Sequence, residues 1–148
     1  MIPLVAMRRS LFALLVLAGC DALSGADFET VRQLGTPAAD GEAITAPDTV
    51  RAGEPFEVTV TTQGGGCHER ADGVEVREHR EGVELRPYDL VSVPVGEGAG
   101  CTYILKHLPR TTVVTLDEPG LQRLRVIGSE GFSPRAGEVV VDRVVVVQ

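Results

Sequence analysis

The stretch FEVTVTT, residues 56–62, alternates apolar and polar side chains. Phe56, Val58 and Val60 fall on one side of an extended chain, and the residues between them are polar. A period of two is typical of a half-buried strand, because successive side chains of a strand point to opposite faces of the sheet. The stretch therefore predicts a β-strand with one face in a core.

The same alternation recurs farther along the chain. Val74 and Val76 are separated from Val83 and Leu85 by a segment that contains HREG, residues 79–82, which suits a hairpin turn. The many charges around these residues resemble those of a surface helix. The four apolar residues share no helical face, however, so we expect two paired strands with the charges on a solvated face.

Three further strands are expected toward the C-terminus. The first is 112–116, and the turn 117–120 leads to the second at 122–126. The last is the valine-rich segment 138–148, which Asp142-Arg143 interrupts. Valine favours strands, and the interruption predicts a bulge or a switch of face. Short strands at close spacing, with Gly and Pro between them, predict an all-β sandwich.

The segment APDTVRAGEPFEVTV, residues 46–60, resembles the opening of bacterial immunoglobulin-like domains, in which an edge strand runs through a Gly turn into a core strand. Pro119-Gly120, followed by Leu124 and Val126, resembles a late turn and strand of the same domains. The resemblance covers residues 42–148 and implies an immunoglobulin-like β-sandwich. The chain departs from the antibody pattern: it has no Trp and no Tyr at the tyrosine corner, and Cys101 does not follow the Pro-Gly turn. Antibody-like function is therefore not implied.

The start of the chain has the pattern of an export signal. Arg8 and Arg9 precede an apolar run at 11–18, which fits a secretory signal peptide and is too short to span a bilayer as a helix. Met7 is a second candidate start beside Met1. Ordinary export fits the sequence around the arginine pair better than the twin-arginine route does.

Leu17-Ala18-Gly19-Cys20 resembles a bacterial lipobox. The resemblance implies removal of residues 1–19, a diacylglycerol thioether on Cys20 and an acyl chain, such as palmitate, on the new amino terminus. Two or more chains give lasting attachment to a membrane. We therefore expect a bacterial lipoprotein, anchored in the cell envelope and facing the periplasm or the exterior. Asp21 resembles the inner-membrane retention signal of enterobacterial lipoproteins, but the choice of membrane stays open.

The segment that follows Cys20 is small, polar and acidic, with Gly and Pro. Residues 20–41 are predicted to be the lipidated cysteine and a flexible tether of roughly 25 Å root-mean-square reach. A short helix near 28–34 is the alternative for part of it. Residues 42–148 are then expected to form a single domain.

The charge of the chain excludes several classes of partner. Removal of Arg8 and Arg9 with the signal peptide takes the formal net charge from −7 to −9. So acidic a surface repels nucleic acid, and the scarcity of aromatic residues argues against stacking on bases or sugars. The expected partners are the membrane, through Cys20, and an unidentified envelope protein or ligand.

Cys67 and Cys101 each follow a Gly-rich loop, and glycine permits close backbone approach. Because exported proteins meet an oxidising compartment, a Cys67–Cys101 disulfide is the natural prediction. The sharper alternative is a zinc site that adds His68 and His107, but their spacing does not match the usual zinc motifs.

Other chemistry finds little support in the chain. No Lys-Ser/Thr follows either Gly-rich loop, as a phosphate-binding loop requires, and His79 has no nucleophile at a familiar spacing. The acidic turns at Asp72 and 117–118 are expected to be solvated rather than to bind calcium. The sequence thus favours a noncatalytic lipoprotein without cofactor or metal, which binds or scaffolds a partner. The alternatives are a small-ligand pocket at the Gly-loop end of the sandwich and, less favoured, a thiol- or zinc-dependent enzyme.

Overall fold

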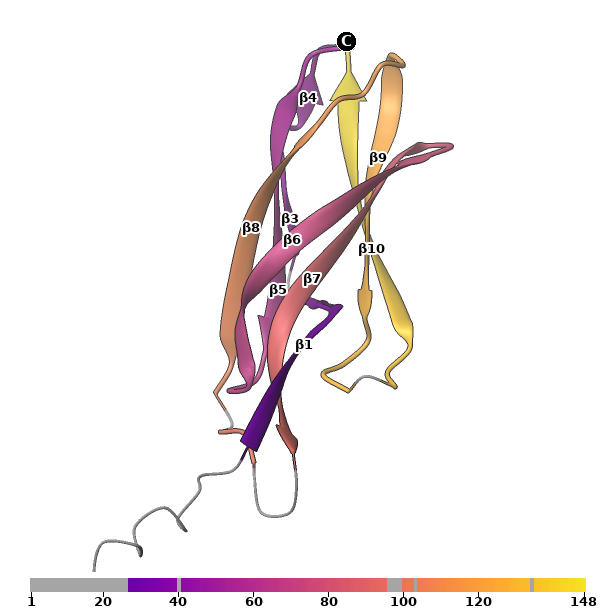
Figure 1. Ribbon diagram of the computed structural model, residues 1–148. Coiled ribbons are helices and arrows are strands. Elements are labelled where there is room, and N and C mark those ends of the chain that lie inside the picture. The colour runs from indigo at the N-terminus through magenta and orange to yellow at the C-terminus, as the bar shows by residue number, and fades with distance from the viewer. Residues whose placement is uncertain (1–26, 40, 96–99, 103, 134) are drawn as a thin grey trace, which may run out of the picture.

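The computed structural model describes residues 27–39, 41–95, 100–102, 104–133 and 135–148. Over these residues the chain is all-β, with ten strands in two sheets that pack face to face (Figure 1). The predicted all-β sandwich is confirmed. None of the described residues lies in a helix long and apolar enough to cross a membrane. The predicted signal peptide and Cys20 lie outside the described residues.

The larger sheet is organised around one long central strand. Its six strands are β1 (Asp27–Leu34), β4 (Thr49–Val50), β6 (His68–His79), β7 (Gly82–Val95), β9 (Gly120–Ser129) and β10 (Glu138–Val147). β6 pairs antiparallel along one edge of β7. The opposite edge is shared: β9 pairs parallel with the first residues of β7, and β1 pairs antiparallel with its last eight. β10 then pairs with β9, and β4 runs parallel to the end of β10.

The smaller sheet is organised around the strand predicted from FEVTVTT. Its four strands are β2 (Thr36–Pro37), β3 (Ile44–Thr45), β5 (Phe56–Gly64) and β8 (Lys106–Val114). β8 pairs with β5 along one edge, and the two short strands β2 and β3 pair with the other.

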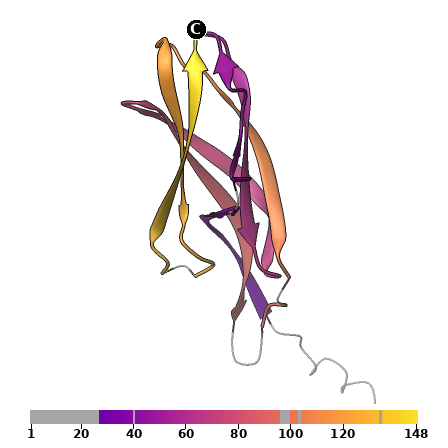
Figure 2. The ribbon, with the colours of Figure 1, turned by 180° about the vertical axis from the view of Figure 1, so that it is seen from behind.

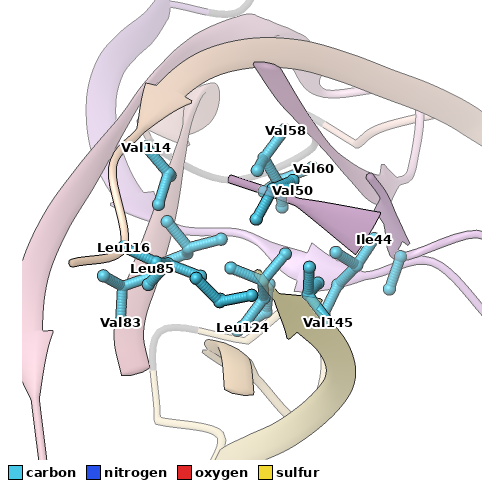
Figure 3. Close-up of a cluster of buried hydrophobic side chains, with 13 residues drawn as sticks. Ile44, Val50, Val58, Val60, Val83, Leu85, Val114, Leu116, Leu124 and Val145 are labelled. Carbon is cyan, nitrogen blue, oxygen red and sulfur yellow. The ribbon is translucent and has the colours of Figure 1, made fainter. Parts of the chain in front are cut away.

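The core lies between the inward faces of the two sheets. Val58 and Val60 of β5 are fully buried and face Leu85, Leu124 and Val145 of the larger sheet (Figure 3). Alternate residues of β5 are buried in the pattern that its sequence predicts. Burial of apolar surface contributes roughly 25 cal/mol per Å², so these aliphatic residues supply most of the free energy that closes the sandwich.

Two predicted turns are present where the sequence places them. β6 ends at His79 and β7 begins at Gly82, whose φ of 139° suits glycine. A side chain at Gly82 would meet the backbone oxygen of Arg123 on β9. Gly53, with a φ of 75°, turns the chain from the edge strand β4 into the core strand β5, as the resemblance to immunoglobulin-like domains implies.

The predicted tether is wrong over its second half. β1 and β2 occupy part of the segment assigned to the tether, and the alternative of a helix at 28–34 is wrong as well. β1 is a strand because the end of β7 offers it an unpaired edge, and all eight of its residues pair there. Its side chains are mostly exposed, so its sequence shows little of the alternation that marks a half-buried strand.

Two predictions for the later strands also need correction. β10 pairs with β9 in unbroken register through Asp142 and Arg143, without a bulge, and the alternation of exposed and half-buried residues continues across them. Arg143 stays in phase with the inward valines because its guanidinium donates to the backbone oxygen of Ala46 and to Asp48. β8 begins at Lys106 rather than near 112, because Pro109 is tolerated in a strand that pairs on one side only.

The two ends of the sandwich differ. The C-terminus, β4 and the start of β9 lie at one end, while β1 begins and β7 ends at the other (Figures 1 and 2). The second end also carries the loop between β5 and β6 and the approach to β8. The first strand, β1, therefore begins at the same end of the sandwich as the Gly-rich loop 64–66.

Candidate functional site

The loop that joins β5 to β6 builds one wall of a cavity. β5 ends at Gly64, β6 begins at His68, and between them Cys67 forms a disulfide with Cys101. The Cα atoms of the two cysteines are 5.2 Å apart, within the range that a disulfide spans. The predicted pairing is confirmed, and it fixes the segment before β8 against the start of β6.

Two glycines of this loop allow the close approach that the sequence predicts. A Cβ atom at Gly64 would lie 2.2 Å from Cγ of the His68 ring, and one at Gly66 would lie 2.2 Å from the Thr102 hydroxyl. Gly66 also donates its N–H to the Thr102 carbonyl at 3.0 Å. Any side chain at either glycine would therefore displace a wall of the cavity.

The cavity has a volume of about 360 Å³. Its apolar lining comes from β7, from the residues just before β8 and from the loop between β9 and β10. The main residues are Val91, Val93, Pro94, Ile104, Leu105 and Phe132. Polar groups reach it from Gln33, His68, Ser92 and Thr102. An apolar pocket with a few convergent polar groups is the usual form of a small-molecule site.

His68 is the buried polar group at the centre of this wall, with 3% of its surface exposed. The backbone N–H of Gly65 donates to its Nδ1 at 3.1 Å, so the neutral ring carries its proton on Nε2. Nε2 lies 3.4 Å from Nε2 of the Gln33 amide, and rotation of this amide by 180° places its oxygen there to accept the proton. The ring of Phe132 packs edge-on against His68, with centroids 5.4 Å apart.

Burial lowers the pKa of His68 below its ordinary value, because removal from water disfavours the charged ring. The negative charge of Asp89 opposes this shift, and the positive charge of Lys106 adds to it. His68 therefore stays neutral near pH 7 and presents an uncharged wall to the cavity.

Lys106 stabilises the loop between β5 and β6 through hydrogen bonds to its backbone. Its Nζ donates to the backbone oxygens of His68 at 2.9 Å and of Gly66 at 3.2 Å. The ammonium group thus satisfies two carbonyls of the turn, and the first residue of β8 is tied to the first residue of β6. Together with the disulfide, this contact makes the cavity wall a cross-linked unit.

A second buried polar group lies next to the cavity but has a different role. Asp89 of β7 is fully buried, and Arg110 of β8 reaches it from the other sheet with Nη2 2.5 Å from Oδ1. Arg110 also donates to the Tyr88 and Leu108 carbonyls and to the Thr62 hydroxyl, while Thr62 donates to Asp89 at 2.9 Å. Every contact runs within or between the sheets, so this cluster acts as a structural cross-link.

The structure does not gather the residues of the alternative zinc site. Cys67 and Cys101 are consumed in the disulfide, and His107 lies on β8 with Nδ1 3.5 Å from Glu42. No three His, Cys, Asp or Glu side chains among the described residues converge as metal ligands would. His79 accepts the N–H of Glu81 at the tip of the β6–β7 hairpin, remote from both cysteines along the chain.

One of the two acidic turns takes part in an ion pair. Asp72 pairs with Arg32 of β1 at 2.6 Å, which ties the predicted tether segment to β6 across the sheet. Residues 117–118 lie in the turn between β8 and β9. The Gly-rich loop at 64–66 leads into a strand rather than a helix, so it lacks the helix N-terminus of a phosphate-binding loop.

The sequence pointed to this end of the molecule through its glycines and cysteines, but it did not identify Gln33 or Phe132. Both come from segments distant in sequence, on β1 and between β9 and β10. In comparisons with known proteins, no family model, curated protein or solved structure matches the chain.

Proposed function

We propose that the protein is a noncatalytic lipoprotein of the bacterial envelope whose sandwich binds a small apolar ligand at its Gly-loop end. The observation that carries the proposal is the cavity of about 360 Å³ between the disulfide loop and Phe132. Small-molecule pockets in proteins fall between about 300 and 1,000 Å³, so the cavity has the size for a ligand rather than for a protein segment.

The chemistry of the walls supports an uncharged and mainly apolar ligand. The side chains from β7 and from residues 104–105 are aliphatic, and Phe132 adds an aromatic face. The neutral ring of His68 has both nitrogens engaged, by Gly65 and Gln33. Thr102 contributes a hydroxyl that can orient a polar end of the ligand, whereas the Ser92 hydroxyl donates to Glu69. An acidic protein of net charge −9 after export would also repel an anionic ligand.

The cavity favours the ligand-binding alternative over pure scaffolding. The glycines, the disulfide and Lys106 all serve to keep the cavity wall in place. A pre-organised pocket loses less conformational entropy when it binds, and that is the advantage of such cross-links. A scaffold that presents only an outer face would not require them.

Binding is tested with N-phenyl-1-naphthylamine, a neutral probe whose fluorescence rises in apolar surroundings. The protein should bind the probe, and Phe132→Ala should weaken binding several-fold because it removes one wall. Val140→Ala is the matched control, since Val140 is about as exposed as Phe132 (51% against 46%) but lies on the outer face of β10. No binding by the unaltered protein, or equal effects of the two variants, would contradict the ligand pocket.

The anchor is tested separately, through Leu17-Ala18-Gly19-Cys20. Mass spectrometry of the membrane fraction should find a mature amino terminus at Cys20 that carries acyl chains. Cys20→Ser should abolish this modification. A protein that keeps the residues before Cys20, or membrane attachment that Cys20→Ser leaves unchanged, would overturn the lipoprotein assignment without bearing on the pocket.

A further inference from the structure

Large apolar side chains are exposed in the lining of the cavity and on the strand residues next to it. Phe28, Val95, Ile104, Leu105 and Phe132 are between 46% and 62% exposed, and we refer to these five residues as the apolar rim. Soluble proteins seldom expose a contiguous group of large apolar residues unless it contacts a partner or a membrane.

The rim is assembled from segments that meet only in the folded domain. Ile104, Leu105 and Phe132 line the cavity. Phe28 of β1 lies directly opposite Pro94 of β7, which lines it too. Val95 is the last residue of β7, and β7 ends at the end of the sandwich where β1 begins (Figure 2).

The rim lies close in sequence to the proposed lipid anchor. β1 starts at Asp27, seven residues after Cys20. A chain spans at most about 3.6 Å per residue, so seven residues bridge no more than about 25 Å. Because β1 begins at Asp27 and not after the predicted tether 21–41, the lipid on Cys20 keeps the β1 end of the sandwich near the bilayer.

We propose that the apolar rim rests on the lipid bilayer surface, as a second membrane contact beside the acyl chains. The proposal depends on the lipidation of Cys20. A lipid surface suits the rim better than a protein partner, because the short link to Cys20 holds the rim at high local concentration against the membrane. Aromatic and aliphatic side chains partition into the headgroup region. The contact turns the mouth of the cavity toward the bilayer.

The absence of charge in the apolar rim also indicates which kind of lipid surface it contacts. The five residues are uncharged, and the mature chain as a whole is strongly acidic. An acidic protein gains nothing from anionic headgroups, so the contact should form on zwitterionic phosphatidylcholine. It should also persist at high salt, because it depends on apolar burial rather than on ion pairs.

The test uses the absence of tryptophan from the chain, which makes a single introduced Trp a clean reporter. Leu105→Trp places it in the rim. Leu121→Trp is the matched control: Leu121 is 73% exposed, but it lies opposite Val146 near the C-terminal end of the sandwich. Both full-length variants are purified in lipidated form, verified by mass, and reconstituted into vesicles of phosphatidylcholine with brominated acyl chains.

Bilayer contact should quench the emission of Leu105→Trp at least two-fold relative to unbrominated vesicles, at low and high salt, and leave Leu121→Trp unchanged. Equal quenching of the two variants, or none, with the acyl chains present would overturn the docking and leave the anchor intact. A blue shift of Leu105→Trp that depends on protein concentration, without quenching, would show instead that a second copy covers the rim. A chain without acyl groups would overturn the anchor, and the docking with it.

Discussion

Asp89 and Arg110 belong to different sheets, yet their side chains meet inside the sandwich, with Arg110 Nη2 2.5 Å from Asp89 Oδ1. The exposed fraction is 0% for the Asp89 side chain and 7% for that of Arg110. A charge pair so far from water is balanced only while both partners are present. The pair therefore ties the two sheets together.

Loss of one partner of this pair should be severe. Arg110→Met leaves the Asp89 carboxylate buried with only the Thr62 hydroxyl as a side-chain donor, and the free energy of unfolding should fall by about 3–5 kcal/mol. The double variant Asp89→Leu/Arg110→Met should recover most of the loss, since no buried charge remains. Urea denaturation measures both. Glu54→Ala, which breaks the exposed pair with Arg51, is the control and should change little.

Removal of the disulfide should destabilise the domain without changing its architecture. The bond closes a loop with a sequence separation of 34, for which chain entropy predicts a loss of about 4 kcal/mol in Cys67→Ser/Cys101→Ser. Circular dichroism should still report strands, because the apolar alternation does not depend on the bond. A chelator should have no effect; unfolding by EDTA, but not by reductant, would restore the zinc alternative.

Gly64 and Gly65 offer a matched pair of substitutions in one loop. Gly64→Ala places a Cβ atom 2.2 Å from Cγ of His68, so it should lower the melting temperature and weaken binding of the apolar probe. Gly65→Ala meets nothing within 4 Å and should be close to neutral for both properties. Thermal unfolding measures the melting temperatures of the two variants, and titration with the probe measures their binding. Equal behaviour of the two variants would mean that the His68 ring is not held as described.

His68 should make stability depend on pH in the mildly acidic range. Its pKa is lowered by burial, so between about 6.5, the unfolded value, and the lower folded value, the unfolded chain binds more protons. The free energy of unfolding should therefore fall as the pH drops below about 6.5 and level off, as far as His68 is concerned, below the folded pKa. His68→Gln should show a smaller decrease. Denaturation between pH 5 and 7.5 measures the difference, and an equal slope in both proteins would contradict it.

Local pattern alone was enough to predict most of the sandwich. The alternation of FEVTVTT gives β5, and the apolar pairs around HREG give the β6–β7 hairpin with its turn at the expected residues. β5 and β7 are predictable because alternate residues of each strand lie in the core, while the charged residues of β6 face water. β1 escaped prediction for the opposite reason. Its exposed side chains carry no alternation, and its partner edge on β7 exists only in the folded protein.

The sequence pattern of single strands shows which polar residues are buried. Asp89 stands in phase with Val83, Leu85 and Val91 on the inward face of β7, and Thr62 stands in phase with Val58 and Val60. A charged residue in such a phase needs a partner, because burial of an unpaired charge is prohibitive. The sequence shows that need, but it does not say which of the basic residues meets it.

By itself, the sequence determined the strand-forming segments, the turns at Gly53 and Gly82, and the pairing of two cysteines that follow Gly-rich loops. The strands and turns depend on neighbouring residues, whose sterics and polarity act over a few bonds, and the pairing follows because Cys67 and Cys101 are the two cysteines that remain beside Cys20. Only the tertiary structure decided that β1 belongs to the sheet, that Asp89 meets Arg110, and that Gln33, His68 and Phe132 surround one cavity. These contacts join residues distant along the chain, so they form only when the two sheets close over a common core. Closure brings buried polar groups together in pairs, and it leaves the cavity open where the glycines have no side chains to fill it.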